Sequence, residues 1–229
     1  ALLFRYRFDN QDLDLIRHRV CEPTSLSNNN VISLFFDRFN VLWVGTENGL
    51  NKMDTRQKAF TVYSETAAPS YRLPVDEVHA IYQDSHGTLW VGLRNNGLFV
   101  IKGNQRKHIS TQDSNWPEFT GNIITSFYED SQGRLWIGIM GGGLNMIENP
   151  ENVWTNDFTF KYFRENQKKE QYLNTWNVRC IIQEDEFSFW LGSLNGIIHV
   201  VFKEQNGEIV IDFFRNYRHI AGNDSSLIG

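Results

Sequence analysis

Short hydrophobic runs alternate along this chain with turns rich in glycine, asparagine and aspartate. A dense apolar run such as residues 31–36 comes first, and a tight turn follows it. A second run carries a tryptophan, a third such as residues 97–101 follows a glycine, and a more polar run such as residues 59–63 alternates. Runs of this length, rich in β-branched and aromatic residues and bounded by turn residues, predict antiparallel strands. The pattern therefore predicts units of four strands.

The unit repeats along the chain. Leu-Trp-Val-Gly at residues 42–45 recurs in closely related form at 89–92, 135–138 and 189–192, so that the tryptophans are 47, 46 and 54 residues apart. Four strands per unit at this period predict an all-β fold, a β-propeller made of four-stranded antiparallel blades. We expect a structural role for the repeated residues, with each tryptophan packing between neighbouring blades. These residues are Trp43, Trp90, Trp136 and Trp190, with Gly45, Gly92, Gly138 and Gly192.

The repeat boundaries predict about four and a half blades. We assign a half blade to residues 1–20, blades to 27–64, 75–111, 121–165 and 176–217, and the lead-in to a missing blade to 218–229. In the half blade, residues 2–6 resemble a third strand and residues 15–20 a fourth. The chain is therefore expected to be a fragment of a larger propeller. Its exposed strand edges favour self-association or pairing with the rest of a full-length chain.

Within each blade the first strand is predicted to be innermost and buried on both sides, because it is apolar nearly throughout. On this basis Cys180 is expected to be a buried free thiol. The acids six residues before each tryptophan, Asp37, Asp84, Asp130 and Glu184, are predicted to cap turns. In the fourth unit Phe187 replaces the turn glycine, so either this turn is built differently or its register moves by one residue.

Composition and motifs disfavour several classes of function. Hydrophobic residues make up 41% and charged residues 21%, as in a globular protein. The net charge of −5 is spread without a basic stripe, which argues against nucleic-acid binding. No apolar run is long enough to insert into a membrane. The six histidines show no metal-ligand spacing, and no nucleophile or phosphate-binding motif is present, so we predict no metal, no cofactor and no catalytic residue.

Propeller geometry suggests where a ligand would bind. The turns between second and third strands share a face with the long, dissimilar connections between blades, residues 64–75, 111–122 and 165–176. Long loops on a rigid scaffold commonly carry function, and aromatic, amide and guanidinium groups suit sugars or peptides. The alternative is that Trp116 and Trp176 only hold their loops in place. The candidate ligand contacts are Glu47, Asn48, Tyr71, Arg72, Arg94, Asn95, Asn96, Trp116, Met140, Tyr172, Trp176 and Asn195.

The repeat resembles the two-component regulator propeller repeat, most closely at residues 130–138 and 84–92, and also in the lead-in at residues 25–31. The resemblance implies the periplasmic sensor region of an inner-membrane protein, a hybrid two-component histidine kinase and response regulator, with an oligosaccharide as the ligand class.

Three functions remain open from the sequence: a ligand sensor, a non-catalytic scaffold for protein–protein contact or dimerisation, and an enzyme such as a propeller lyase or glycosidase. A glycosidase needs two facing carboxylates across the central pocket. Acids are sparse on the expected ligand face, so no enzymatic activity is predicted for this fragment.

Overall fold

The computed structural model describes residues 3–8, 11–20, 22, 24–54, 60–65, 72–74, 76–113, 115–155, 157–163, 177–219 and 227. The described residues form antiparallel sheets with one short 3-10 helix, η2 (Pro150–Trp154). Four sheets have four strands each, and the N-terminal sheet has two. The predicted all-β propeller architecture is confirmed.

Each blade is one sheet whose strands follow one another in sequence. The N-terminal hairpin is β1 (Leu3–Arg7) and β2 (Asp12–Ile16). Blade 1 contains β3 (Val31–Phe36), β4 (Val41–Thr46), β5 (Gly49–Asp54) and β6 (Phe60–Tyr63). Blade 2 contains β7 (Val78–Gln83), β8 (Leu89–Leu93), β9 (Leu98–Lys102) and β10 (Gln105–Ile109). Blade 3 contains β11 (Ile124–Glu129), β12 (Leu135–Ile139), β13 (Gly143–Ile147) and β14 (Phe160–Tyr162). Blade 4 contains β15 (Val178–Gln183), β16 (Ser188–Ser193), β17 (Gly196–Gln205) and β18 (Glu208–Tyr217).

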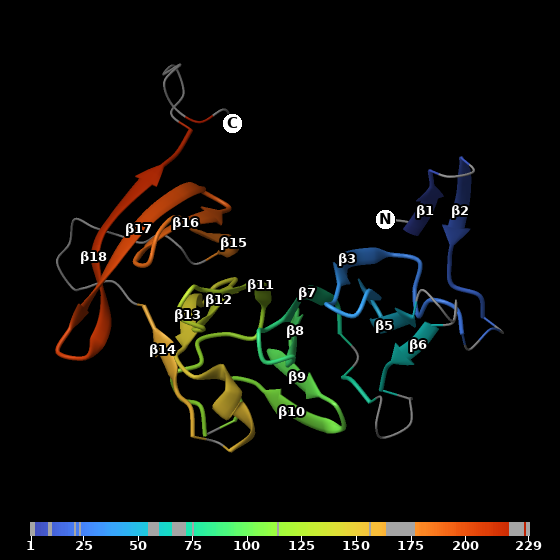
Figure 1. Cartoon of the computed structure of the whole chain (residues 1–229), viewed down its shortest axis with the longest axis horizontal. Helices are drawn as coiled ribbons and strands as arrows, with labels where there is room; N and C mark the ends of the chain where they lie inside the picture. The colour runs from blue at the N-terminus through green and yellow to red at the C-terminus, as the bar shows by residue number, and fades with distance from the viewer. Residues whose placement is uncertain are drawn as a thin grey trace.

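The blades follow one another along an open arc, with the β1–β2 hairpin and blade 4 at its two ends (Figure 1). In the hairpin, the fourth-type strand is β2 at residues 12–16, so its predicted place at residues 15–20 was wrong. At this position Asp14 Oδ2 lies 2.5 Å from Arg5 Nη2 and 3.0 Å from Arg7 Nη2 on the facing strand.

The first strands are innermost, since β7 contacts β3 and β11, and β11 contacts β15. Their expected burial on both sides was wrong. β8, β12 and β13 are buried along their whole length, whereas β7 and β11 are mostly half-buried. On β3, Leu34 and Phe36 are 55% and 59% exposed. These two side chains face away from blade 2. On that side the described structure has only the two-stranded β1–β2 hairpin.

Cys180 is exposed, which corrects the expectation of a buried thiol. Its repeat counterpart Ser33 hydrogen-bonds to the carbonyl oxygen of Val78 in the following blade at 3.1 Å. No further blade follows β15–β18 within the described part of the chain. The thiol therefore lies on a surface that is an interface in the earlier blades.

The repeated tryptophans join neighbouring blades in the first three copies. Trp43 packs in one cluster with Val78 and Val91 of blade 2, Trp90 with Ile124 of blade 3, and Trp136 with Val178 of blade 4. The glycine two residues later permits this approach, because a Cβ at Gly45 would lie 2.8 Å from the carbonyl oxygen of Val78. These three tryptophans therefore lie at contacts between successive blades.

The repeated aspartates have a second role beside turn capping. In blade 1, Asp37 Oδ1 accepts hydrogen bonds from the backbone N–H of Phe39 and Val41. Its Oδ2 accepts the indole N–H of Trp43 at 3.0 Å, and Asp84 and Asp130 bind their tryptophans at 2.8 and 2.7 Å. One carboxylate thus fixes both the turn and the ring that packs on the next blade.

Blade 4 keeps the register but builds its turn differently. Gln183 pairs with Phe189 as Gln83 pairs with Leu89. The backbone N–H of Phe187 is bound by Asp185 Oδ1 at 3.0 Å, while Glu184 contacts Ser188 Oγ and His199 Nε2. Trp190 stacks on His199 with ring centroids 4.4 Å apart. The first of the two alternatives for this turn is therefore the observed one.

Blades 2, 3 and 4 each supply a side-chain acceptor to the turn of the blade before them. Gln83 Oε1 accepts the backbone N–H of Arg38, Glu129 Oε2 that of Ser85, and Gln183 Oε1 that of Ser131. These three acceptors end the innermost strands of blades 2, 3 and 4, and Phe36 stands at the same place in blade 1. We call Gln83, Glu129 and Gln183 the latch residues.

Candidate functional site

The turns between second and third strands place several predicted ligand contacts at one face of the arc. Glu47, Asn48, Arg94, Asn95 and Asn195 are exposed, and Met140 is half-buried. The backbone N–H of Glu47 donates to the carbonyl oxygen of Asn30, that of Arg94 to Glu77, and that of Met140 to Ile123. These bonds join each turn to the residue just before the innermost strand. In blades 1, 2 and 3 the face therefore has a rim in which a turn residue is hydrogen-bonded to the residue before the innermost strand.

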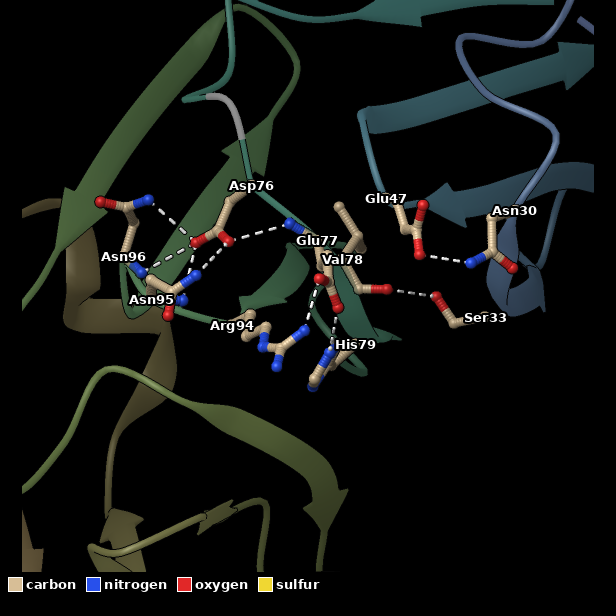
Figure 2. A network of polar contacts seen from close by, with 10 residues as sticks. All are labelled: Asn30, Ser33, Glu47, Asp76, Glu77, Val78, His79, Arg94, Asn95 and Asn96. Atoms are coloured by element: carbon tan, nitrogen blue, oxygen red, sulfur yellow. Dashed lines mark hydrogen bonds and ion pairs between the residues drawn. The ribbon is translucent and has the colours of Figure 1, made fainter. Parts of the chain in front are cut away.

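In blade 2 a buried carboxylate organises the turn (Figure 2). Asp76 is 6% exposed and accepts hydrogen bonds from the backbone N–H and the side-chain amides of Asn95 and Asn96 at 2.7–3.0 Å. The amide nitrogens of both asparagines are therefore already used within the blade. They shape the turn, and the ring of His108 holds the Asn96 carbonyl oxygen at 2.6 Å.

Beside this turn, Glu77 contacts the side chains of Arg94 and His79 (Figure 2). Its Oε1 lies 2.5 Å from Arg94 Nη1, and its Oε2 lies 3.2 Å from His79 Nε2. The hydrogen bond from His79, with help from Arg94, holds the pKa of Glu77 below its ordinary value of 4.5, and partial burial opposes this shift. Arg94 keeps half of its side-chain surface in solvent, so it remains accessible to a ligand.

The lowered pKa of Glu77 predicts a pH effect on stability. Because the folded-state pKa lies below the unfolded one, ionised Glu77 stabilises the fold above about pH 4.5, and this contribution is lost as the pH falls through the lowered value. Titration of the carboxyl carbon by NMR should therefore give a midpoint below 4.5. His79→Ala should move that midpoint upward. A midpoint at or above 4.5 in the unaltered protein would contradict this account of the cluster.

Blade 1 presents a different pair at the same rim positions. Asn30 Nδ2 donates to Glu47 Oε1 (Figure 2). Blade 3 has Ile123 with Met140 here, and blade 4 has Asn177 with Leu194, which is 56% exposed. The rim thus changes from charged and polar in blades 1 and 2 to largely apolar in blades 3 and 4. The residues Asn30, Glu47, Glu77, His79 and Arg94 are called the polar rim below.

The other predicted contacts are distributed differently. Arg72 is exposed, while the backbone N–H groups of Asn48 and Asn195 are bound by Thr46 and Ser193 within their own turns. Trp116 is 6% exposed, and its ring stacks on Phe158 at 4.2 Å with Lys107 Nζ 4.8 Å away. No face of this ring is open to a ligand, which favours the alternative that Trp116 holds its loop in place. Tyr71, Tyr172 and Trp176 lie outside the described residues.

Sequence reasoning missed Asn30, Asp76, Glu77 and His79. A signal for two of them was present, because Asn30 and Glu77 stand thirteen residues before their tryptophans, in step with Glu47 and Arg94 four residues after. Comparing these paired positions between copies would have indicated the rim. Among the described residues, no group of three or more histidine, cysteine or acidic side chains is placed to hold a metal ion. In the described part, no helix is long and apolar enough to cross a membrane.

Comparison with known proteins identifies the repeat. The family model for the two-component regulator propeller matches residues 25–48, 72–95 and 118–141. This chain carries two-component regulator propeller repeats. Each matched propeller repeat runs from the connection before a blade, through the innermost and tryptophan strands, to the rim turn.

One curated relative and two solved structures are similar to this chain over part of their own length. Histidine kinase P4 of Formosa agariphila is 35% identical over 83 residues, which are 35% of this chain and 6% of that protein. The extracellular domain of the putative hybrid two component system BT3049 from B. thetaiotaomicron matches with a TM-score of 0.64 and 23% identity, covering 97% of this chain and 26% of that one. Virginiamycin B lyase from Staphylococcus aureus matches with a TM-score of 0.57 and 14% identity, over 92% of this chain and 62% of the lyase. These structural likenesses show the fold, and folds of one kind carry different functions.

Proposed function

We propose that the chain is an extracytoplasmic ligand-sensing module of a membrane-bound two-component signalling protein, a sensor histidine kinase. The observation that supports this most is the set of propeller repeats together with the 35% identity to a protein named as a histidine kinase. The likeness to an extracellular domain supports a place outside the cytoplasm, in the periplasm. The module itself is proposed to bind and not to catalyse.

We further propose an oligosaccharide as the ligand, bound at the polar rim. Glu47 and Arg94 are exposed there, and Asn30 adds an amide that donates to Glu47 Oε1. Carboxylate, amide and guanidinium groups can each bind two neighbouring hydroxyl groups, which suits vicinal diols. The carboxylates of Asp76 and Glu77 already accept hydrogen bonds within blade 2, a use that fits binding better than acid–base catalysis.

A thermal-shift screen of the full sensor region against a panel of oligosaccharides tests this proposal. A recognised glycan at about one hundred times its Kd adds about 2.7 kcal/mol of stability, which should raise the Tm of a region larger than this chain by a few degrees. Arg94→Ala and Glu47→Ala should each remove most of that rise. Lys203→Ala is a matched control, because Lys203 is also 51% exposed and also pairs with an acid, at 2.7 Å, but lies on β17, away from the polar rim.

The scaffold function is the second candidate, and one observation favours it. Phe4, Tyr6, Leu13 and Leu15 share one face of the N-terminal hairpin and are 42–59% exposed. An apolar face of this kind is typical of a contact with another protein surface. If no glycan shifts Tm and sedimentation shows a stable dimer, the scaffold function replaces the sensor.

A further inference from the structure

The departures of this chain from its own repeat converge on one place between blades 3 and 4. Phe187 replaces the turn glycine, β17 and β18 each extend to ten residues, and the segment between β13 and β14 contains η2. The long hairpin reaches beside β14, where Lys161 Nζ lies 3.8 Å from Glu208 Oε2 (Figure 1). In repeat proteins, insertions that gather on one face often mark a binding face. This face carries the turns between first and second strands and is opposite to the polar rim.

A groove lies where these departures meet. A depression of about 370 Å³ is lined by the turns of both blades and by the tip of the β17–β18 hairpin, including Gln132, Phe187 and Gly207. A second depression of about 210 Å³ shares Glu148 and Asn149 with it and continues to Asp157 and Phe158. The two open depressions share the residues Glu148 and Asn149, and they are called the groove below.

The groove is lined by carboxylates from three different elements. Glu148 follows β13, Glu186 lies in the blade 4 turn, and Glu204 lies on β17. None of the three pairs with a cation among the described residues, although Glu186 accepts a hydrogen bond from Gln132 Nε2 at 3.3 Å. A concave site lined by one sign of charge concentrates ions of the opposite sign. The carboxylates are too spread to form a metal cluster within the described chain, which favours an organic cation.

Arg134 adds a second, independent feature. It is 9% exposed, lines the groove, and its charge is matched by Asp130 at 2.6 Å. Its Nη2 makes only a 3.4 Å contact with the Glu186 carbonyl oxygen, and its Nη1 has no hydrogen-bond partner in the described part of the chain. Nη1 is not among the buried atoms that lack a partner, so it reaches the surface of the groove, where it can donate to a ligand oxygen.

We propose that this groove binds a small ligand that carries a protonated amine beside hydroxyl or ether oxygens, the chemistry of a deacetylated amino sugar. The ammonium group lies among Glu148, Glu186 and Glu204, an oxygen accepts from Arg134, and the half-buried ring of Phe187 covers the apolar edge of the ligand. The site is on the face opposite to Arg94 and Glu47, so it goes beyond the proposed sensor function and does not depend on it.

Isothermal titration of the whole chain at about pH 6, where sugar amines are protonated, tests the proposal with three probes. They are fully deacetylated chitotriose, neutral cellotriose with the same number of rings, and spermidine, which has amines without oxygens. Chitotriose should bind at least about tenfold more tightly than either other probe, and its binding should weaken at high salt. Glu148→Gln and Glu204→Gln should each weaken it about two- to fivefold, the range for exposed ion pairs.

Glu118→Gln is the matched control. Glu118 is an exposed acid in the connection between blades 2 and 3, outside the groove, so its replacement should leave binding unchanged. Equal binding of cellotriose would show that the groove does not recognise the amine. Equal binding of spermidine would show that it does not recognise the oxygens. An equal loss with Glu118→Gln would show diffuse attraction to an acidic surface. Each of these results, or no binding of chitotriose, overturns the proposal. The thermal-shift result at the polar rim stands separately from all of them.

Discussion

Replacing Asp130 with alanine is expected to lower the free energy of unfolding by about 3–5 kcal/mol, the range for removing one partner of a buried ion pair. The Asp130 side chain is fully buried and accepts hydrogen bonds from the backbone N–H of Gln132 and Arg134. It also binds Arg134 Nε at 2.6 Å and the Trp136 indole N–H at 2.7 Å. The variant leaves the Arg134 Nε–H and the Trp136 indole N–H without an acceptor and removes the carboxylate that balances the buried guanidinium charge. Urea unfolding followed by circular dichroism would measure the loss.

Glu184→Ala is the control for this prediction, since Glu184 stands at the same repeat position in blade 4. Its side chain is 49% exposed, and it binds Ser188 and His199 instead of an arginine and a tryptophan. We expect a loss of about 1 kcal/mol or less, as for an exposed ion pair. Equal losses in the two variants would show that the Asp130 network stabilises the fold no more than any turn cap.

Replacing Trp136 with alanine should cost about 3–5 kcal/mol of unfolding free energy, the usual range for a large buried aromatic side chain. Trp136 has no exposed surface, and its ring lies 5.2 Å from that of Phe163, 4.7 Å from Phe189 and 4.8 Å from Phe202. Phe189 and Phe202 belong to blade 4, so the alanine variant opens a cavity at the contact between two blades.

Trp190→Ala is the matched comparison for the same measurement. Trp190 is only half-buried, its described ring contacts are with His199 and Tyr217 of its own blade, and Glu184 does not bind its indole N–H. Its loss should be less than half of that for Trp136→Ala. The opposite order would mean that the tryptophans stabilise single sheets and not the contacts between them.

The fold was predictable because its determinants are repeated. Four copies of the Trp-x-Gly motif specify the strand that carries the ring. The glycine that lets the next blade approach Trp43 can be identified directly in the sequence. The hydrogen bond from Trp43 to Asp37 was not predicted, although the spacing of six residues was noted. That bond depends on two side-chain rotamers meeting across a turn, which residue spacing alone does not specify.

Burial was predicted less well than strand order. Apolar composition indicated that Leu34 and Cys180 were covered, but the cover for each position comes from a neighbouring blade, and the described structure has a full blade on only one side of each. The rim was predicted in part. Glu47 and Arg94 lie on the expected face, whereas the side-chain amides of Asn95 and Asn96 are bound by Asp76 and the ring of Trp116 packs on Phe158. Loop composition cannot distinguish a side chain that binds a ligand from one that holds its own loop.

The latch residues make the arc a one-dimensional cooperative array. Ser85 in blade 2 donates to Glu129 of blade 3, and Ser131 in blade 3 donates to Gln183 of blade 4. A local opening of blade 3 therefore also releases a turn of blade 2, so that stability is shared between nearest neighbours as in other repeat proteins. The series starts at Gln83, because Phe36 has no acceptor to offer. We therefore expect that loosening one blade weakens first the turn of the blade before it, which it holds through a latch residue.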